Sequence, residues 1–199
     1  TKQRLFRRPM KQIIVLITSI IMLPLTIIFY LVKPFVSIDS VFASCAQLIS
    51  LFPGKLGSYL RIGFYRYSMS HCSSNCMISF AVLFSQTNTE INDGVYIGPQ
   101  SNIGSCVIEK NCLLGSGVHI LSGKRQHNFS CPDTPLKDQG GEYQKITIGE
   151  NTWIGNGSIV MANVGRNCVI GAGSVVTSDV ADNSVMSGNP ATFIKHTHA

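Results

Sequence analysis

The stretch ITIGENTWIGNGSIVMANVGRNCVIGAGSVV, residues 146–176, decides the fold of this chain. An aliphatic residue followed by glycine recurs in it, at Ile148-Gly149, Ile154-Gly155, Val164-Gly165 and Ile170-Gly171. Within each half of the stretch the pairs are six residues apart. A period of six fits no helix, but it fits a solenoid in which each hexapeptide supplies one short strand and one corner. The stretch therefore predicts a parallel β-solenoid.

The same pairs recur earlier in the chain, at Ile97-Gly98, Ile103-Gly104 and Leu114-Gly115. We expect every aliphatic residue of the series to point inward, and a small or β-branched residue four positions later to point inward as well. These second positions are Val95, Ser101, Val107, Cys112, Val118, Thr152, Ser158, Cys168 and Ser174. Glycine and polar residues between them take the turns, where a positive φ costs glycine and asparagine little. One coil cannot bury its own apolar side, so neighbouring coils must stack.

One long interruption divides the repeat. After Ile120 the period fails until Ile146, and residues 123–145 read GKRQHNFSCPDTPLKDQGGEYQK. Shorter slips separate Ile103 from Ile108 and Val160 from Val164. A polar loop of this length inside a compact domain is usually functional or disordered. We call residues 123–145 the insert, and its one histidine, His127, becomes a candidate for catalysis.

The charge of the chain is unevenly distributed. The net charge is +6, and only 13% of the residues are charged. Residues 1–66 hold nine basic residues and one acid, whereas residues 67–199 hold seven basic residues and nine acids. The basic excess lies beside an apolar run, which indicates an anionic membrane surface. Nucleic-acid binding would need basic and aromatic residues interleaved on a folded face, so no nucleic acid is expected as a partner.

The apolar run, residues 13–32, has no charged residue and basic residues on both sides. As a helix it would span ~30 Å, the thickness of a hydrocarbon core. Pro24 interrupts it at the middle, because proline removes a helix hydrogen bond. Two arrangements stay open: a kinked helix that crosses the membrane, and a re-entrant hairpin that turns at Pro24. Because basic residues lie on both flanks, the positive-inside rule does not choose a direction for a crossing.

A second apolar stretch, residues 40–51, ends at Phe52-Pro53-Gly54. Arginines and aromatic residues alternate with aliphatic ones over residues 56–67. This segment fits an interfacial helix with an aromatic belt, or equally a helix that packs on the body of the domain. The seven cysteines form no CxxC pair, which favours small buried thiols in a reducing compartment.

Residues 146–195 resemble the hexapeptide-repeat acyltransferases, and the SGNPA ending at residues 187–191 resembles the acetyltransferases among them. ILSGKRQHNF at 120–129 and LFPGKLGSYLR at 51–61 resemble the membrane-associated branch that O-acetylates exopolysaccharides such as colanic acid. The resemblance implies a left-handed parallel β-helix, a homotrimer and acetyl-CoA as co-substrate. It implies a glycan or lipid-linked sugar as acceptor, and no metal.

The resemblance also assigns roles to residues. The family's catalytic histidine falls on His127, and its donor-binding residues fall on Trp153, Asn156, Ala172, Thr177 and Lys195. Ser178 and Thr192 stand where many relatives carry basic residues, so Lys195 would carry more of the contact with the CoA phosphates. A second polar active-site residue should come from residues 79–88 of a neighbouring chain. Ser79, Ser85, Gln86 and Asn88 are all open choices for it.

The residue types fit acyl transfer independently of the resemblance. A sugar hydroxyl needs a base, and the pKa of histidine lies near working pH. Strand alternation points His119 outward, where it either lines the acceptor site or is a solvated surface residue. Trp153 is expected outward as well, as a wall for the pantetheine arm or sugar ring.

We therefore expect a membrane-associated helical region at residues 1–70 and a left-handed β-helix domain at 71–199. The predicted function is O-acetylation of a surface polysaccharide or its lipid-linked precursor, at the cytoplasmic face of the inner membrane. A non-catalytic, membrane-tethered trimeric scaffold is the alternative. A metalloenzyme on the same solenoid would need three histidine ligands, and only His119 and His127 lie in the right region.

Overall fold

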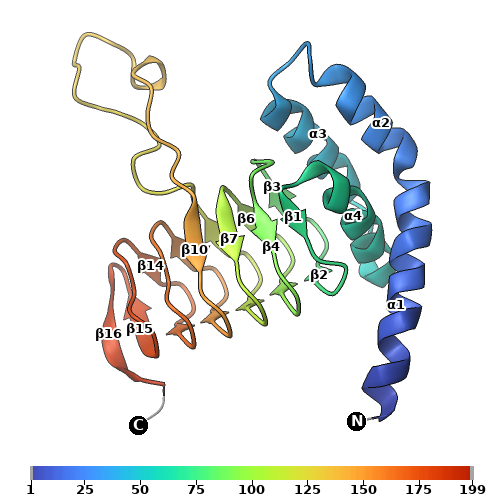
Figure 1. Cartoon of the computed structure of the whole chain (residues 1–199). Coiled ribbons are helices and arrows are strands. Elements are labelled where there is room, and N and C mark those ends of the chain that lie inside the picture. The colour runs from blue at the N-terminus through green and yellow to red at the C-terminus, as the bar shows by residue number, and fades with distance from the viewer. Residues whose placement is uncertain (1, 198–199) are drawn as a thin grey trace.

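The computed structural model of the chain describes residues 2–197. Residue 1 and residues 198–199, at the outer ends of the two predicted regions, lie outside the described residues. The helices come first and gather at one end of the molecule (Figure 1). They are α1 (Lys2–Ile21), α2 (Leu23–Val32), α3 (Ile38–Ser50) and α4 (Gly54–Ser68). The predicted boundary at residue 70 falls between α4 and the first strand.

Beyond α4 the chain winds through short strands that stack into a prism (Figure 1). Nearly all neighbours are parallel, in sheets ordered β1-β4-β7-β10, β16-β15-β13-β11-β8-β5-β2 and β14-β12-β9-β6-β3. The strands are β1 (His71–Cys72), β2 (Met77–Ile78), β3 (Leu83–Phe84), β4 (Glu90–Ile91), β5 (Tyr96–Ile97), β6 (Asn102–Ile103), β7 (Cys106–Ile108), β8 (Leu113–Leu114), β9 (His119–Ile120), β10 (Ile146–Ile148), β11 (Trp153–Ile154), β12 (Ile159–Val160), β13 (Val169–Ile170), β14 (Val175–Val176), β15 (Ser184–Gly188) and β16 (Ala191–His196). The fold is the predicted parallel β-helix of the left-handed class.

The interior of the prism confirms the predicted pattern of inward residues. The aliphatic positions of the repeat, such as Ile97, Ile154 and Ile170, are completely buried. The small positions four residues later are buried too, except Val107, which is half-buried. The interval from Ile103 to Ile108 is one residue short, so Cys106 takes the inward place instead.

The slips in the period all fall at one corner of the prism. Residues stacked in adjacent C-terminal coils, such as Trp153 and Val169, are 16 positions apart, so one side of each coil is shorter than a hexapeptide. The short side joins the sheet of β14, β12 and β9 to the sheet that begins with β1. The insert leaves the prism at this same corner, between β9 and β10.

Asparagines form tight corners of the prism, and glycines let neighbouring coils approach closely. Asn151, Asn167 and Asn183 have φ between 54° and 59°, and their side-chain amides form a ladder with bonds of 2.9 and 3.2 Å. The glycines that follow the aliphatic residues have no side chain, which allows the backbones of neighbouring coils to lie close together. A Cβ on Gly149 would lie 2.5 Å from the backbone nitrogen of Arg166.

Helix α4 packs on the body of the domain, which decides between the two predictions for residues 56–67. Ile62, Phe64 and Tyr65 are completely buried, in one hydrophobic core that continues into the solenoid. Arg61 is completely buried too, and its guanidinium donates hydrogen bonds to backbone carbonyls at the end of α3 and in β2. The residues of this segment that stay exposed are Leu56 in the first turn of α4 and Arg66 and Tyr67 in its last turn.

Helices α1 and α2 meet at a break beside Pro24. No single helix among residues 2–197 is long and apolar enough to cross a membrane, but Met10–Ile21 and Leu23–Val32 meet that test as a pair bent by 52°. A pair bent in this way fits a broken span or a re-entrant loop, so both predicted arrangements stay predictions. The full reversal of the chain comes later, at residues 33–37 between α2 and α3 (Figure 1).

Candidate active site

The insert is an arm with two irregular backbone segments that hydrogen-bond to each other across its base. The amide of Gln144 donates to Ser122 (3.0 Å), that of Glu142 donates to Arg125 (2.8 Å), and that of Asn128 donates to Gly140 (2.9 Å). The two segments approach closely because residue 141 is glycine: a Cβ there would lie 1.9 Å from the carbonyl oxygen of Gln126. The arm projects away from the prism (Figure 1).

A glutamine organises the tip of the arm. The Gln139 amide nitrogen donates to the carbonyls of Cys131 and Thr134, and its oxygen accepts from the Cys131 amide. Cys131 is exposed, and a hydrogen bond with Thr134 lowers the pKa of its thiol. The other six cysteines are buried, as expected for structural thiols.

His127 lies on the first segment of the arm, between the paired residues Arg125 and Asn128, and its side chain is exposed. Its neighbour Gln126 turns toward the prism and lines a cavity of about 300 Å³ at the base of the arm. The backbone pairing of the arm thus fixes His127 next to this cavity, although His127 is not part of its wall.

The wall of the cavity is mostly polar. The sheet supplies Asn102 and His119, which are stacked in register on β6 and β9, and the arm supplies Gln126 and Tyr143. His119 is exposed, and the next residue, Ile120, is buried, which confirms that alternation turns His119 outward. Sequence reasoning missed Asn102, Gln126 and Tyr143. Asn102 could have been found, because it precedes the inward Ile103 and sits one coil before His119.

Two of the open choices for the second polar residue also line this cavity. Ser85 and Gln86 reach it from the same chain that supplies His119. The prediction places this residue on a neighbouring chain. In this structure Ser85 and Gln86, which directly follow β3, lie at the base of the arm of their own chain.

The predicted donor-binding residues occupy three places on the prism. Trp153 and Lys195 share one outer row of a sheet, because Trp153 pairs with Val169, Val169 with Val185, and Val185 with Lys195. Trp153 is 52% exposed, as expected for a wall residue. The row ends on β16, an antiparallel strand that closes the stack.

Asn156 and Ala172 are stacked at the next corner. The Asn156 side-chain oxygen accepts a hydrogen bond from the Ser116 amide (3.0 Å), and its carbonyl accepts one from the Gly173 amide (2.8 Å). Gly115 and Gly155 make this corner compact, since a Cβ on Gly155 would lie 2.5 Å from the Ala172 nitrogen.

Thr177 lies at the corner from which the arm leaves. Its carbonyl oxygen is 3.4 Å from the Lys124 ammonium, which donates a hydrogen bond to it from the arm. Within one chain, therefore, only Thr177 of the predicted donor-binding residues is shown in contact with the arm. The pair of Trp153 and Lys195 and the pair of Asn156 and Ala172 lie on other parts of the surface.

Ion pairs form outside the wall of the cavity. Lys145, the last residue of the insert, and Glu90 of β4 form one of 2.6 Å. Arg166 and Asp182 form another at a corner of the last coils, and the hydrogen bond from Arg166 lowers the pKa of Asp182. Among residues 2–197, no group of three His, Cys, Asp or Glu residues is placed to hold a metal ion.

Known protein families and solved structures share this architecture. The family described as bacterial transferase hexapeptide (six repeats) matches residues 145–178, which confirms the repeat in that segment. The solenoid has the fold of left-handed β-helix acyltransferases. No curated protein sequence matches the chain significantly.

Three solved structures show the same fold at low sequence identity. A maltose O-acetyltransferase from Clostridium difficile 630 has 24% identity and a TM-score of 0.54, over 78% of this chain and 84% of the other. A galactoside acetyltransferase in complex with coenzyme A has 22% identity and a TM-score of 0.58, over 79% and 80%. A variant of AntD, an N-acyltransferase from Bacillus cereus in complex with dTDP-4-amino-4,6-dideoxyglucose and coenzyme A, has 19% identity and a TM-score of 0.51, over 61% and 70%.

Proposed function

We propose that this chain transfers an acetyl group from acetyl-CoA to a hydroxyl of a surface polysaccharide or of its lipid-linked precursor. One observation carries the proposal: a histidine-bearing arm leaves a hexapeptide-repeat prism beside a polar cavity. The structures that share the fold support it, because they are named as acyltransferases and two of them hold coenzyme A.

In the proposed reaction His127 is the general base. Its imidazole takes the proton of the sugar hydroxyl, and the hydroxyl oxygen attacks the thioester carbonyl. The carbon–sulfur bond then breaks, and CoA leaves as a thiol after the imidazolium returns the proton. The outward polar residues at the base of the arm, Asn102 and Gln126, are suited to hold the acceptor sugar by hydrogen bonds.

We propose that the active unit is a homotrimer. The arm carries large apolar side chains in solvent, of which Phe129 is 86% exposed and Tyr143 is 57% exposed. A neighbouring copy would cover them and would bring His127 to that copy's outer row of Trp153 and Lys195. In the trimer, His127 of one chain and the donor-binding residues of the next would then form one active site, although they lie apart within a single chain.

The direct test is transfer of acetyl from acetyl-CoA to a panel of oligosaccharides, measured by thiol release and by mass spectrometry of the sugar. We expect thiol release that depends on the sugar. A chain that neither binds acetyl-CoA nor releases thiol with any sugar would instead be the non-catalytic scaffold.

Replacing Lys195 with glutamate tests the donor site. We expect the KM for acetyl-CoA to rise by about tenfold, because a charge-assisted contact with phosphate becomes repulsive, while the KM for the sugar changes little. The control is Lys137→Glu, which makes the same charge change at the tip of the arm. An unchanged donor KM in Lys195→Glu would remove this residue from the site.

We also propose that the helical region holds the protein at the cytoplasmic face of the inner membrane, where acetyl-CoA is available. With the exposed Cys131 replaced by serine and the other six cysteines buried, a cysteine introduced at position 2 or at position 195 can be probed in intact cells. Both positions should be protected from a membrane-impermeant thiol reagent. Labelling of one and protection of the other would show a single crossing and exclude the hairpin.

A further inference from the structure

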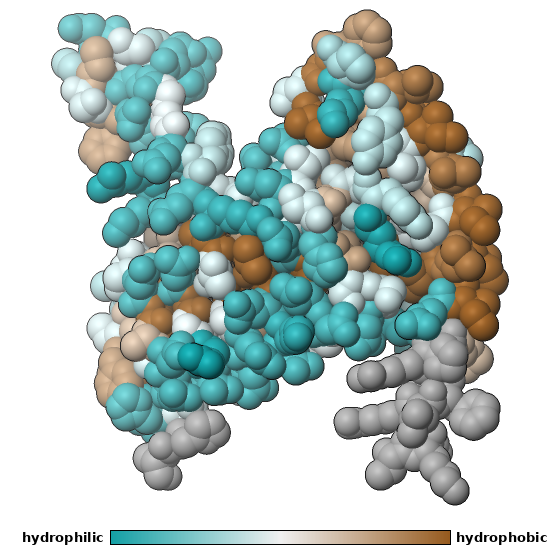
Figure 2. All heavy atoms as spheres, in the orientation of Figure 1, coloured by the Kyte–Doolittle hydropathy of each residue, from teal (hydrophilic) through white to brown (hydrophobic). Residues whose placement is uncertain are grey.

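The outer face of α1 and α2 is apolar and in contact with solvent. Figure 2 shows this hydrophobic surface along the outer edge of the helical end, whereas the visible face of the prism is mostly hydrophilic with smaller hydrophobic patches. Ile13, Ile17 and Ile28 are between 52% and 59% exposed. The opposite face is fixed to the body of the protein, because Val15 is completely buried and the Thr18 hydroxyl donates to the Tyr59 carbonyl of α4 (3.0 Å).

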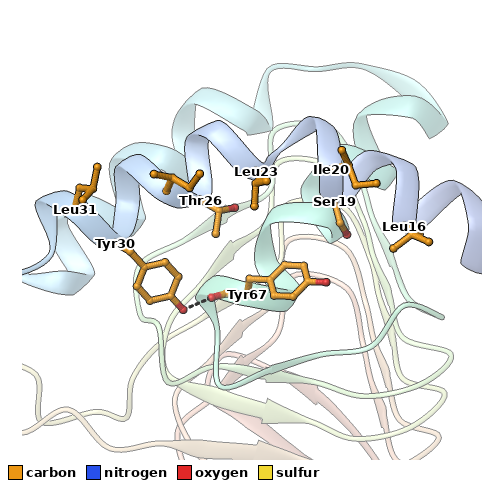
Figure 3. A pocket seen from close by; sticks show the side chains of 9 residues that line it. Leu16, Ser19, Ile20, Leu23, Thr26, Tyr30, Leu31 and Tyr67 are labelled. Atoms are coloured by element: carbon orange, nitrogen blue, oxygen red, sulfur yellow. Dashed lines mark hydrogen bonds between the residues drawn. The ribbon is translucent and has the colours of Figure 1, made fainter.

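A groove of about 490 Å³ runs along this pair of helices, across the break between them. Its apolar wall includes Leu16, Ile20 and Leu23, which Figure 3 labels along α1 and α2, and Ile27 one turn after Leu23. Ligand pockets in proteins typically have volumes of ~300–1,000 Å³. The groove therefore has the size of a binding site, and it opens onto the apolar face described above.

Three hydroxyl groups in the wall, those of Ser19, Thr26 and Tyr30, donate hydrogen bonds to backbone carbonyls. Ser19 donates to Val15, Thr26 donates to Met22, and Tyr30 donates to the carbonyl of Tyr67 on α4, as Figure 3 shows for the last of these. A polar ligand would have to displace these bonds at a cost. The groove is therefore suited to a hydrocarbon chain rather than to a sugar or a peptide backbone.

Two cations flank the tyrosines in the wall. The Lys33 ammonium lies 5.6 Å from the centre of the Tyr30 ring, and the Arg66 guanidinium lies 6.0 Å from the centre of the Tyr67 ring. The Tyr30 hydroxyl donates to the Tyr67 backbone carbonyl, so both cations lie beside residues of the groove wall that are in contact with each other. An apolar groove with cations beside its wall is complementary to an apolar chain that ends in a phosphate.

We infer that this groove binds one acyl chain of an anionic membrane phospholipid, with the lipid phosphate between Lys33 and Arg66. The inference rests on the proposed membrane association and makes it specific: α1 and α2 lie along the membrane surface with one face on α4, and a single lipid is held in the groove. Lipids that meet the exposed apolar face provide the occupant, since the groove opens onto that face.

The first experiment measures lipid retention by native mass spectrometry of the full chain after exchange into detergent. Incubation with phosphatidylglycerol should leave one lipid bound per chain, and phosphatidylcholine should bind about 25-fold more weakly, since Lys33 and Arg66 each contribute ~1 kcal/mol to contact with anionic lipid. Glycerophosphate, which has the phosphate but no chain, should not compete. Equal retention of the two lipids, or competition by glycerophosphate, would overturn the inference.

A matched pair of variants tests the groove itself. Ile27→Trp fills it, whereas Ile28→Trp adds the same side chain at the adjacent position on the outer face, outside the groove wall. Both residues are about half exposed, so both variants should keep the thermal stability of the wild type. Ile27→Trp should lose the bound lipid and Ile28→Trp should keep it. Equal retention by both variants would refute the site.

Charge variants test the phosphate end. Lys33→Gln and Arg66→Gln should each weaken phosphatidylglycerol retention about fivefold, and Lys55→Gln on the first turn of α4 should not. A change of oligomeric state in Ile27→Trp, without loss of lipid, would show that the groove holds another protein chain instead. Acetyl transfer to a soluble oligosaccharide in detergent should be unchanged in Ile27→Trp, so failure of the lipid site leaves the proposed enzyme activity untouched.

Discussion

His127→Ala should lower acetyl transfer by ~10²–10⁴-fold, the usual effect of losing a general base. The reason is its position: backbone hydrogen bonds at Arg125 and Asn128 hold it on the arm, next to a residue that lines the polar cavity. The variant should keep the fold and the oligomeric state, because the His127 side chain is exposed. Initial rates at saturating acetyl-CoA, with size-exclusion chromatography alongside, provide the measurement.

His119 provides the matched control for this experiment. It is also exposed, and it lines the cavity directly from β9. His119→Ala should affect the KM for the sugar more than kcat, since it is expected to contact the acceptor and not to move the proton. If His119→Ala abolishes transfer and His127→Ala leaves it intact, the base is His119 and the assignment of His127 is wrong.

Arg61→Met should destabilise the protein by ~3–5 kcal/mol, because it breaks a buried, charge-assisted network. The Arg61 guanidinium donates to the carbonyls of Ile49 (3.2 Å), Phe52 (2.8 Å) and Ile78 (3.1 Å), and so joins the end of α3 to the first coil of the prism. Methionine fills similar space but leaves these carbonyls unpaired. Burial lowers the pKa of Arg61, because the charged guanidinium loses its hydration there.

Arg66→Met is the control, one turn further along α4, where the arginine is exposed. It should change the free energy of unfolding by no more than ~0.5 kcal/mol, as is usual for surface substitutions. Urea denaturation of both variants in detergent, followed by circular dichroism, gives the comparison. A loss below ~1 kcal/mol in Arg61→Met would show that the network is dispensable.

The outward and inward sides of the coils were predictable from sequence residue by residue. Ile154 and Ile170 are buried, and Trp153 and His119 are exposed, as the pattern requires. Val107 is the exception, because the shortened side of its coil shifts the inward place to Cys106. A slip of one residue reverses the direction of a side chain on a strand, so the prediction fails where the period slips.

The candidate site was predictable only in part. The sequence pointed to the insert and to His127, but not to the cavity formed by Asn102, Gln126 and Tyr143. The backbone pairing between the two sides of the arm, such as Asn128 with Gly140, brings distant parts of the insert to the same place. Such pairing leaves no periodic signal in the sequence.

The sequence by itself determined the solenoid, because inward and outward positions repeat locally and every coil meets the same requirement to stack. It also determined that residues 13–32 are apolar and broken at Pro24. Only the tertiary structure decided where that apolar segment lies and which of its faces stays exposed. The Lys11 ammonium bonds to the Cys76 carbonyl across 65 positions of sequence, and Arg61 joins α3 to β2 from a buried place on α4. Contacts between such distant segments depend on the shape and unpaired carbonyls of both partners, which a local pattern does not encode.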